Sequence, residues 1–148
     1  MNITLRKITM KNFHECITLS LTEEQTHFVA SNMYSLAEAK ADNVSCPFAI
    51  YTDEQMVGFI MYWFDEANEK LWIDRLMVDK KYQGNGYGKQ AMKMVVDEYM
   101  NNDKCKLLRT SFVPQNTKAK KVYESLGFKS TGEICDGEEV MVIEKWEK

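Results

Sequence analysis

The stretch Gln83-Gly84-Asn85-Gly86-Tyr87-Gly88 decides the fold class of this chain, because it separates two segments of different periodicity. The apolar run Leu71–Val78 before it is typical of a buried strand. The segment after it has apolar residues at i, i+3, i+4 and i+7, as on one helix face, and these are Met92, Val95, Val96 and Tyr99. A glycine loop between a strand and a helix offers backbone N–H groups and the positive end of the helix dipole to an anion. The stretch therefore predicts a site for a phosphate or pyrophosphate.

The spacing of the three glycines fits neither of two common phosphate loops. A dinucleotide fold needs G-x-G-x-x-G with an acidic residue about 20 positions later. A Walker loop needs Gly-Lys-Ser/Thr, and here Lys89 is followed by Gln90. The pattern Gln, two residues, Gly, one residue, Gly after an apolar strand instead resembles the acyl-coenzyme A loop of the GNAT N-acetyltransferases. For six residues alone, a tight turn remains the alternative interpretation.

A second motif lies further along the chain. Residues 106–113 predict a short strand, Pro114 ends it, and residues 116–128 predict a capped helix. That helix matches the GNAT pattern N-x-x-A-x-x-x-Y-x-x-x-G-F at Asn116, Ala119, Tyr123 and Gly127-Phe128. Taken singly, Asn116 is only an N-cap and Gly127 only a helix stop. Because both motifs occur, in the order that the family has them, the family is favoured over the plain structural interpretation.

The resemblance implies an acetyl-coenzyme A dependent N-acetyltransferase in which the amine attacks the thioester directly. In the family, backbone groups of the strand before the loop pair with the pantetheine and polarise the thioester carbonyl. The coenzyme-binding residues implied here are Leu76, Met77, Val78, Gln83, Gly84, Asn85, Gly86, Tyr87, Gly88, Lys89, Asn116, Ala119 and Tyr123. Tyr123 also occupies the place of the tyrosine that acts as general acid in many members. The alternative is a buried tyrosine whose hydroxyl meets another partner.

Asp74 is the second catalytic candidate, because a carboxylate within an apolar strand is costly unless a cation, a donor or a substrate pairs with it. Strand alternation predicts that Trp72, Asp74 and Leu76 share one face and that Arg75 shares the other with Ile73 and Met77. In GNAT polyamine acetyltransferases an acidic residue at a matching distance before the loop binds the substrate or removes a proton through water. A structural ion pair with a basic residue of another element is the alternative.

The acceptor side rests on a weaker resemblance. Residues 23–32 look like the helical segment that covers the acceptor groove in bacterial spermine/spermidine acetyltransferases. The substrate-binding residues that this implies are Glu23, Glu24, Phe28, Trp72 and Asp74. An acidic pair in the first turn of a helix is also favoured by the helix dipole, which is the alternative for Glu23 and Glu24.

Composition is compatible with this assignment. With 148 residues, 45% of them hydrophobic, the chain is most simply one domain, residues 1–148. It lacks a membrane-length apolar run and a signal-peptide pattern, so we expect a cytoplasmic protein without a membrane partner. The four cysteines lack metal-ligand spacing, so we expect no metal and reduced thiols. A formal charge of −3 argues against a nucleic-acid partner and suits a small cationic amine.

The order of predicted elements completes the fold class. Residues 2–8 predict a strand, and box-like spacings at Asn12/Glu15, Thr22/Gln25 and Ser35/Glu38 predict three helix starts. Two strands flank Asp53-Glu54, and a final pair surrounds Asp136-Gly137. The result is an α/β, single-domain, GNAT-like mixed and mostly antiparallel central sheet flanked by helices. A last strand over residues 138–145 would also allow a homodimer.

Three classes of function remain open from the sequence. The leading one is transfer of an acetyl group to a primary amine of spermine or spermidine, with an aminoglycoside, an amino acid or a protein N-terminus as other acceptors. The second is a non-catalytic acyl-coenzyme A binding module. The third is a plain α/β interaction domain in which both motifs are coincidental.

Overall fold

The computed structural model describes residues 2–145. Its strands are β1 (Ile3–Lys7), β2 (Cys46–Thr52), β3 (Gln55–Asp65), β4 (Lys70–Val78), β5 (Leu107–Phe112), β6 (Lys129–Cys135) and β7 (Glu138–Glu144). Its helices are α1 (Phe13–Thr18), α2 (Asn32–Asp42), α3 (Tyr87–Met100) and α4 (Thr117–Ser125), with 3-10 turns η1 (Glu23–Gln25) and η2 (Lys80–Tyr82). The predicted single domain, residues 1–148, includes positions outside the described range.

All of these strands form one sheet, in the order β1-β2-β3-β4-β5-β7-β6. Only β4 and β5 run parallel, and every other neighbouring pair is antiparallel. The fold class predicted from the sequence, a mixed and mostly antiparallel sheet flanked by helices, is confirmed.

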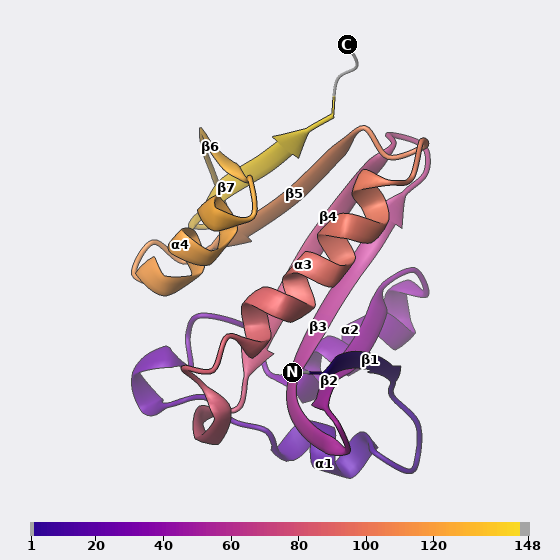
Figure 1. The fold of residues 1–148 in the computed structure, drawn as a ribbon, viewed down its shortest axis with the longest axis vertical. Helices are drawn as coiled ribbons and strands as arrows, with labels where there is room; N and C mark the ends of the chain where they lie inside the picture. Colours follow the sequence, from indigo (N-terminus) through magenta and orange to yellow (C-terminus); the bar gives the residue numbers. More distant parts are fainter. Residues whose placement is uncertain (1, 146–148) are drawn as a thin grey trace.

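The parallel pair β4–β5 comes apart partway along its length. Pairing joins Lys70–Ile73 to Leu107–Thr110 and goes no further. At the last pair, the Thr110 hydroxyl donates a hydrogen bond of 3.1 Å to the Ile73 carbonyl. Beyond that point β4 continues beside β3, while β5 continues beside β7. Figure 1 shows the resulting divergence of β5 and β7 from β4. The sheet is therefore split in its middle.

The helices cover the two faces of the sheet separately. Apolar residues of α3, including Met92 and Val95, form one core cluster with Leu71 and Tyr123. In Figure 1, α3 crosses in front of β3 and β4, and α4 lies near β5 and β7. On the other face, Cys16 of α1 is buried in a second cluster, against which Leu36 and Ala39 of α2 pack. Among residues 2–145, no helix is long and apolar enough to cross a membrane.

A β-bulge at Asp74 corrects the predicted alternation of β4. Met61 of β3 pairs with Arg75, and the next residue, Tyr62, pairs with Ile73, so Asp74 is the extra residue of β4. Two residues that simple alternation would place on one face therefore face opposite layers when the bulge lies between them. Ile73 lies in the core on the α3 side and Met77 in the core under α1 and α2. The prediction that Arg75 shares a face with both was wrong, because pairing with β3 overrides simple alternation.

Of the three predicted helix starts, one is displaced and another lacks its predicted side-chain cap. The helix expected at Ser35 begins one turn earlier, where the Ser31 side chain accepts a hydrogen bond from the Tyr34 N–H. Asn12 does precede α1, but its side chain accepts from the Thr9 N–H instead of capping the helix. The box at Thr22 forms as predicted, and the element that it starts is the short 3-10 turn η1.

Candidate active site

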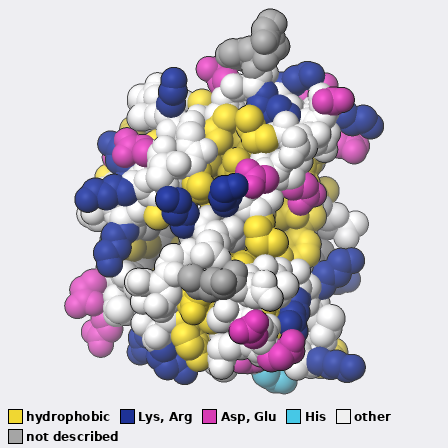
Figure 2. Space-filling view, in the orientation of Figure 1, with side chains coloured by type: hydrophobic (Ala, Val, Ile, Leu, Met, Phe, Trp, Pro, Cys, Tyr) yellow, Lys and Arg dark blue, Asp and Glu magenta, His cyan; other side chains and the backbone are white. Residues whose placement is uncertain are grey.

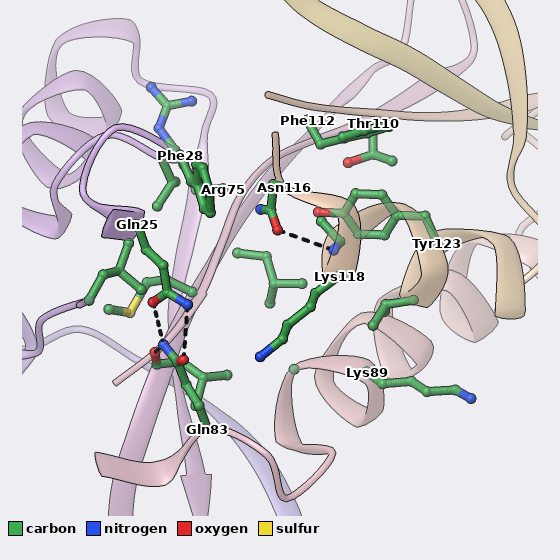
Figure 3. Close-up of a pocket in the computed structure, with 18 of the residues that line it drawn as sticks. Gln25, Phe28, Arg75, Gln83, Lys89, Thr110, Phe112, Asn116, Lys118 and Tyr123 are labelled. Atoms are coloured by element: carbon green, nitrogen blue, oxygen red, sulfur yellow. Dashed lines mark hydrogen bonds between the residues drawn. The ribbon is translucent and has the colours of Figure 1, made fainter. Parts of the chain in front are cut away.

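The split between β4 and β5 opens into a cavity of about 530 Å³. Its walls come from the β4 edge, the segment around η1, the glycine loop with the start of α3, the start of α4, and the ends of β5 and β7. Figure 3 shows side chains from these elements converging on it. Segments far apart in the sequence thus meet at one site because the sheet separates there.

One wall is an unpaired strand edge. Arg75 to Val78 pair with β3 on one side, while pairing with β5 ended at Ile73. Backbone N–H and C=O groups of this stretch therefore face the cavity without a neighbouring strand. An extended ligand can pair with such an edge as an additional strand would. Leu76, Met77 and Val78, which the sequence assigns to the pantetheine, all line the cavity here.

The glycine loop forms a second wall and has the backbone geometry of an anion site. Gly84 and Gly86 have φ of +87° and +81°, a region that glycine adopts without strain. Gly86 is the N-cap of α3, and no side chain caps the helix. The first N–H groups of α3 are therefore available to an anion, reinforced by the helix dipole. At Gly88 a Cβ would lie 3.3 Å from Val78 Cγ2, so glycine lets the helix pack closely on β4.

Lysine side chains add positive charge on the same side of the sheet. Lys118, in the first turn of α4, lines the cavity and reaches into it, whereas Lys89 points away (Figure 3). Figure 2 shows lysine and arginine side chains across the middle of the face on which α3 and α4 lie. Lys118 thus places a positive charge at the cavity although the chain carries a net charge of −3. That charge suits a phosphate-bearing ligand.

Gln83, the first residue of the loop, ties the loop to the segment around η1. Gln25 Nε2 donates to Gln83 Oε1 at 3.2 Å, and Gln83 Nε2 donates to Gln25 Oε1 at 2.9 Å. Gln83 Nε2 also donates to the Val78 carbonyl at 2.9 Å. The reciprocal amide pair, visible in Figure 3, holds the η1 segment against the glycine loop and the end of β4. The side chain of Gln83 is therefore structural, and its backbone remains for a ligand.

The start of α4 brings Asn116 and Tyr123 to the cavity. Asn116 Oδ1 accepts from the Ala119 N–H at 3.2 Å, so its N-cap role and its place in the cavity wall coexist. Tyr123 is 6% exposed and packs against Phe112 and Phe128. Burial raises the pKa of Tyr123 to about 12, and the polar Thr110 hydroxyl opposes the rise. The phenol is consequently a protonated donor at neutral pH.

Asp74 brings a carboxylate to the cavity from the bulge of β4. Although part of Asp74 is exposed to the cavity, burial raises its carboxyl pKa to about 6. The positive charge of Arg75 opposes the rise and the negative charge of Glu38 adds to it. Arg75 is committed to Glu38, whose Oε1 lies 2.8 Å from Arg75 Nη2. Within residues 2–145 Asp74 has no ion-pair partner within 4.0 Å, which disfavours the structural ion pair considered from the sequence.

Four residues assigned to the site from the sequence lie outside the cavity wall. Glu23 and Glu24 are exposed on η1, while Gln25 and Phe28 turn inward. Asn85 turns its side chain back to the Tyr82 carbonyl. Trp72 stacks on Trp63 with ring centroids 5.8 Å apart, and the Arg109 guanidinium lies 4.3 Å from the Trp72 ring centroid. The remaining assigned residues line the cavity; they are Leu76, Met77, Val78, Gln83, Gly84, Gly86, Tyr87, Gly88, Lys89, Asn116, Ala119, Tyr123, Phe28 and Asp74.

Other cavity residues were missed from the sequence, namely Gln25, Thr110, Ser111, Lys118 and Glu138. The polar pair Thr110-Ser111 in an otherwise apolar strand was the one signal available. Lysines and glutamates on amphipathic segments ordinarily face water, so Lys118 and Glu138 gave none. Among residues 2–145, no group of three or more His, Cys, Asp or Glu side chains is placed to hold a metal ion.

Comparison with known proteins agrees with the fold. A model of the acetyltransferase (GNAT) family matches residues 8–128. The chain therefore belongs to the GNAT family of acetyltransferases. It is 32% identical to a probable spermine N(1)-acetyltransferase of Bacillus subtilis subsp. natto (strain BEST195). It is 31% identical to the spermine/spermidine N(1)-acetyltransferase of Bacillus subtilis (strain 168), and each alignment covers 97% of this chain and 99% of the relative.

Solved structures show the same fold at low sequence identity. A spermidine N-acetyltransferase from Vibrio cholerae in complex with CoA and spermine superposes with a TM-score of 0.77 at 15% identity, covering 97% of this chain and 95% of that one. The aminoglycoside acetyltransferase AAC(6')-Ib, solved with an aminoglycoside and acetyl-CoA, gives a TM-score of 0.80 at 16% identity, covering 98% and 94%. Because these two structures differ in acceptor, the fold alone does not select one.

The raised pKa of Asp74 predicts how Asp74→Asn changes stability. The folded pKa of about 6 lies above the ordinary 3.8, so folding favours the neutral carboxyl and this contribution is lost as pH rises through about 6. Asparagine never ionises. Urea denaturation should therefore show that Asp74→Asn gains stability relative to the unmodified chain between pH 4 and pH 7.

Asp42→Asn is the matched control of opposite sign. Hydrogen bonds from Ser45 and Val44 lower the pKa of Asp42, so this variant should lose stability relative to the unmodified chain as pH rises. If Asp74→Asn behaved like Asp42→Asn, Asp74 would be stabilised by a partner, and a burial-raised pKa would be excluded.

Proposed function

We propose that this acetyltransferase uses acetyl-coenzyme A to acetylate a primary amine of a polyamine such as spermine or spermidine. The observation that carries the proposal is one cavity at the split of the sheet, lined by Lys118 from the α3–α4 side and by the carboxylate of Asp74 from the β4 edge. Asp74 lies near Glu38 and Asp42 of α2. Charges of opposite sign in one cavity match a phosphate-bearing coenzyme and a cationic acceptor. The two Bacillus relatives support the choice of acceptor.

The coenzyme side follows from the backbone. The uncapped start of α3 and the loop glycines would hold the pyrophosphate, with Lys118 supplying a counter-charge. The open edge of β4 would pair with the pantetheine arm, and its N–H groups would polarise the thioester carbonyl. When bound, acetyl-coenzyme A supplies the activated acetyl group.

Two side chains would transfer the protons of the reaction. The acceptor is an ammonium ion with a pKa near 10, so it must lose a proton before its nitrogen bonds to the acetyl carbon. Asp74 would accept that proton through water, which its pKa of about 6 allows at neutral pH. Tyr123 would donate its hydroxyl proton to the sulfur as the carbon–sulfur bond breaks. The products are an N-acetylated amine and the free thiol.

Other acceptors and a non-catalytic binding module remain as outcomes of the test. Thiol release should be measured with spermine, spermidine, monoamines of equal length, an aminoglycoside, an amino acid and a peptide with a free N-terminus. Polyamines should give the highest kcat/KM, and added salt should raise their KM as charge attraction is screened. Turnover of an aminoglycoside or a peptide without polyamine turnover would reject a polyamine as the acceptor. Coenzyme binding without any turnover would reject catalytic activity with these amines.

Tyr123→Phe tests the proton donor. The variant keeps the ring that packs on Phe112 and Phe128, so it should fold and bind coenzyme A normally while kcat falls about 10²-fold. Tyr99→Phe is a matched control, because burial raises the Tyr99 pKa to about 12 as well and Tyr99 lies outside the cavity. Steady-state kinetics and a thermal melt should be run on the same samples. An unchanged kcat with a lowered melting temperature would show that the Tyr123 hydroxyl has a structural role and is not the proton donor.

A cytoplasmic location, a homodimer and the absence of a nucleic-acid partner stay predictions from the sequence. The function proposed here does not depend on them.

A further inference from the structure

Glu138 is an acidic residue of the cavity that the proposed chemistry does not use. It is the first residue of β7 and is half-buried in the cavity wall. The Ser111 hydroxyl donates a hydrogen bond of 2.7 Å to Glu138 Oε1. Within residues 2–145, the other carboxylate oxygen, Oε2, has no hydrogen-bond partner. A half-buried carboxylate that is oriented at one oxygen and unpaired at the other is available to a ligand.

The strand register places Glu138 on the side of the sheet away from α4. Leu108 and Phe112 of β5 lie in the core beneath α3 and α4, so Ser111 faces the opposite layer. Ser111 pairs with Val140 of β7, and Glu138 follows the same alternation two residues before Val140. The residue nevertheless lines the same cavity as Tyr123, and its negative charge adds to the burial that raises the pKa of Tyr123. Glu138 therefore shares one cavity with Tyr123 and Asp74.

The arginines of β4 and β5 on that side of the sheet, Arg75 and Arg109, are already paired. Arg75 is bound to Glu38 at 2.8 Å, and Arg109 lies 3.7 Å from Glu133 and over the Trp72 ring. Asp74 and Glu138 both line the cavity, and within the described residues neither has an ion-pair partner within 4.0 Å. Two carboxylates without an ion-pair partner in one cavity favour a cationic ligand that reaches both.

We propose that Glu138 binds a second cationic nitrogen of the acceptor, from the β7 side of the split, while Asp74 serves the reacting nitrogen from the β4 side. The inference rests on the proposed function and deepens it, because it names a residue that selects acceptors with two or more positive charges. A monoamine has no second nitrogen that Glu138 could bind. A polyamine can place one nitrogen at Asp74 and another at Glu138. The ammonium bound to Glu138 does not react, and it holds the polyamine in place while the nitrogen at Asp74 is acetylated.

Glu138→Gln tests this assignment through the selectivity for charge. The variant keeps the size of the side chain and can still accept a hydrogen bond from Ser111. The KM for spermidine should rise about tenfold, the loss expected for one charge-assisted hydrogen bond, while the KM for n-butylamine changes less than about threefold. The kcat for spermidine and the Kd for coenzyme A should stay within a few-fold of the unmodified values.

Two further variants separate binding from structure. Glu139→Gln changes the next residue of the same strand, outside the cavity wall, and should leave both KM values unchanged. Ser111→Ala removes the orienting hydroxyl and should raise the spermidine KM less than Glu138→Gln does. If Glu138→Gln and Ser111→Ala lowered the melting temperature equally and altered both amines alike, Glu138 would be structural and the inference would be wrong.

Titration calorimetry of spermidine into the protein saturated with coenzyme A separates this inference from the proposed function. Binding that weakens about tenfold in Glu138→Gln supports the role of Glu138 even if no polyamine is turned over. Failure of the unmodified protein to bind spermidine, or equal binding by both proteins, overturns it. Turnover of polyamines with an unchanged KM in Glu138→Gln would leave the proposed function intact and reject only Glu138.

Discussion

The structure depends on the point at which β4 and β5 stop sharing hydrogen bonds. Pairing ends at Ile73 and Thr110, where the Thr110 hydroxyl donates a hydrogen bond to the Ile73 carbonyl. Backbone groups inside a protein are ordinarily paired, so a central strand edge left open calls for a partner. The bulge at Asp74 lies immediately after the separation and turns the carboxylate to the cavity. Edge, cavity and carboxylate therefore share one structural cause.

The split also joins two faces of the sheet that carry different charges. On the α3–α4 side, glycine backbone, a free helix start and Lys118 favour an anion. On the other side, Asp74 and Glu138 reach the cavity while the nearby arginines are engaged with other residues. Tyr123 lies where the two sides meet, with its hydroxyl kept protonated by burial. In the proposed function, an anionic coenzyme and a cationic acceptor would approach the same point from opposite faces.

Local patterns predicted most of the fold and most of the residues that line the cavity from the glycine loop and the start of α4. The glycine loop, α3 and α4 follow from residue spacing and caps, which depend on neighbours in the sequence. The bulge at Asp74 could not be predicted, because it is set by register with β3. It places Ile73 and Met77 on opposite faces of the sheet, whereas the sequence predicted that they share one. The cavity residues near η1 were predicted less well. Which residues of η1 face inward depends on a 3-10 turn, so Gln25 lines the cavity where Glu23 and Glu24 were expected.

Amide hydrogen exchange, followed by NMR with and without coenzyme A, tests the central claim most directly. If the open edge of β4 receives the coenzyme, amides among Leu76–Val78 and the first turn of α3 should exchange rapidly in the free protein and become protected in the complex. Amides of Lys70–Ile73, already paired with β5, should change little. Saturation with coenzyme A that leaves the Leu76–Val78 amides unprotected, or that protects only residues outside the split, would contradict the account.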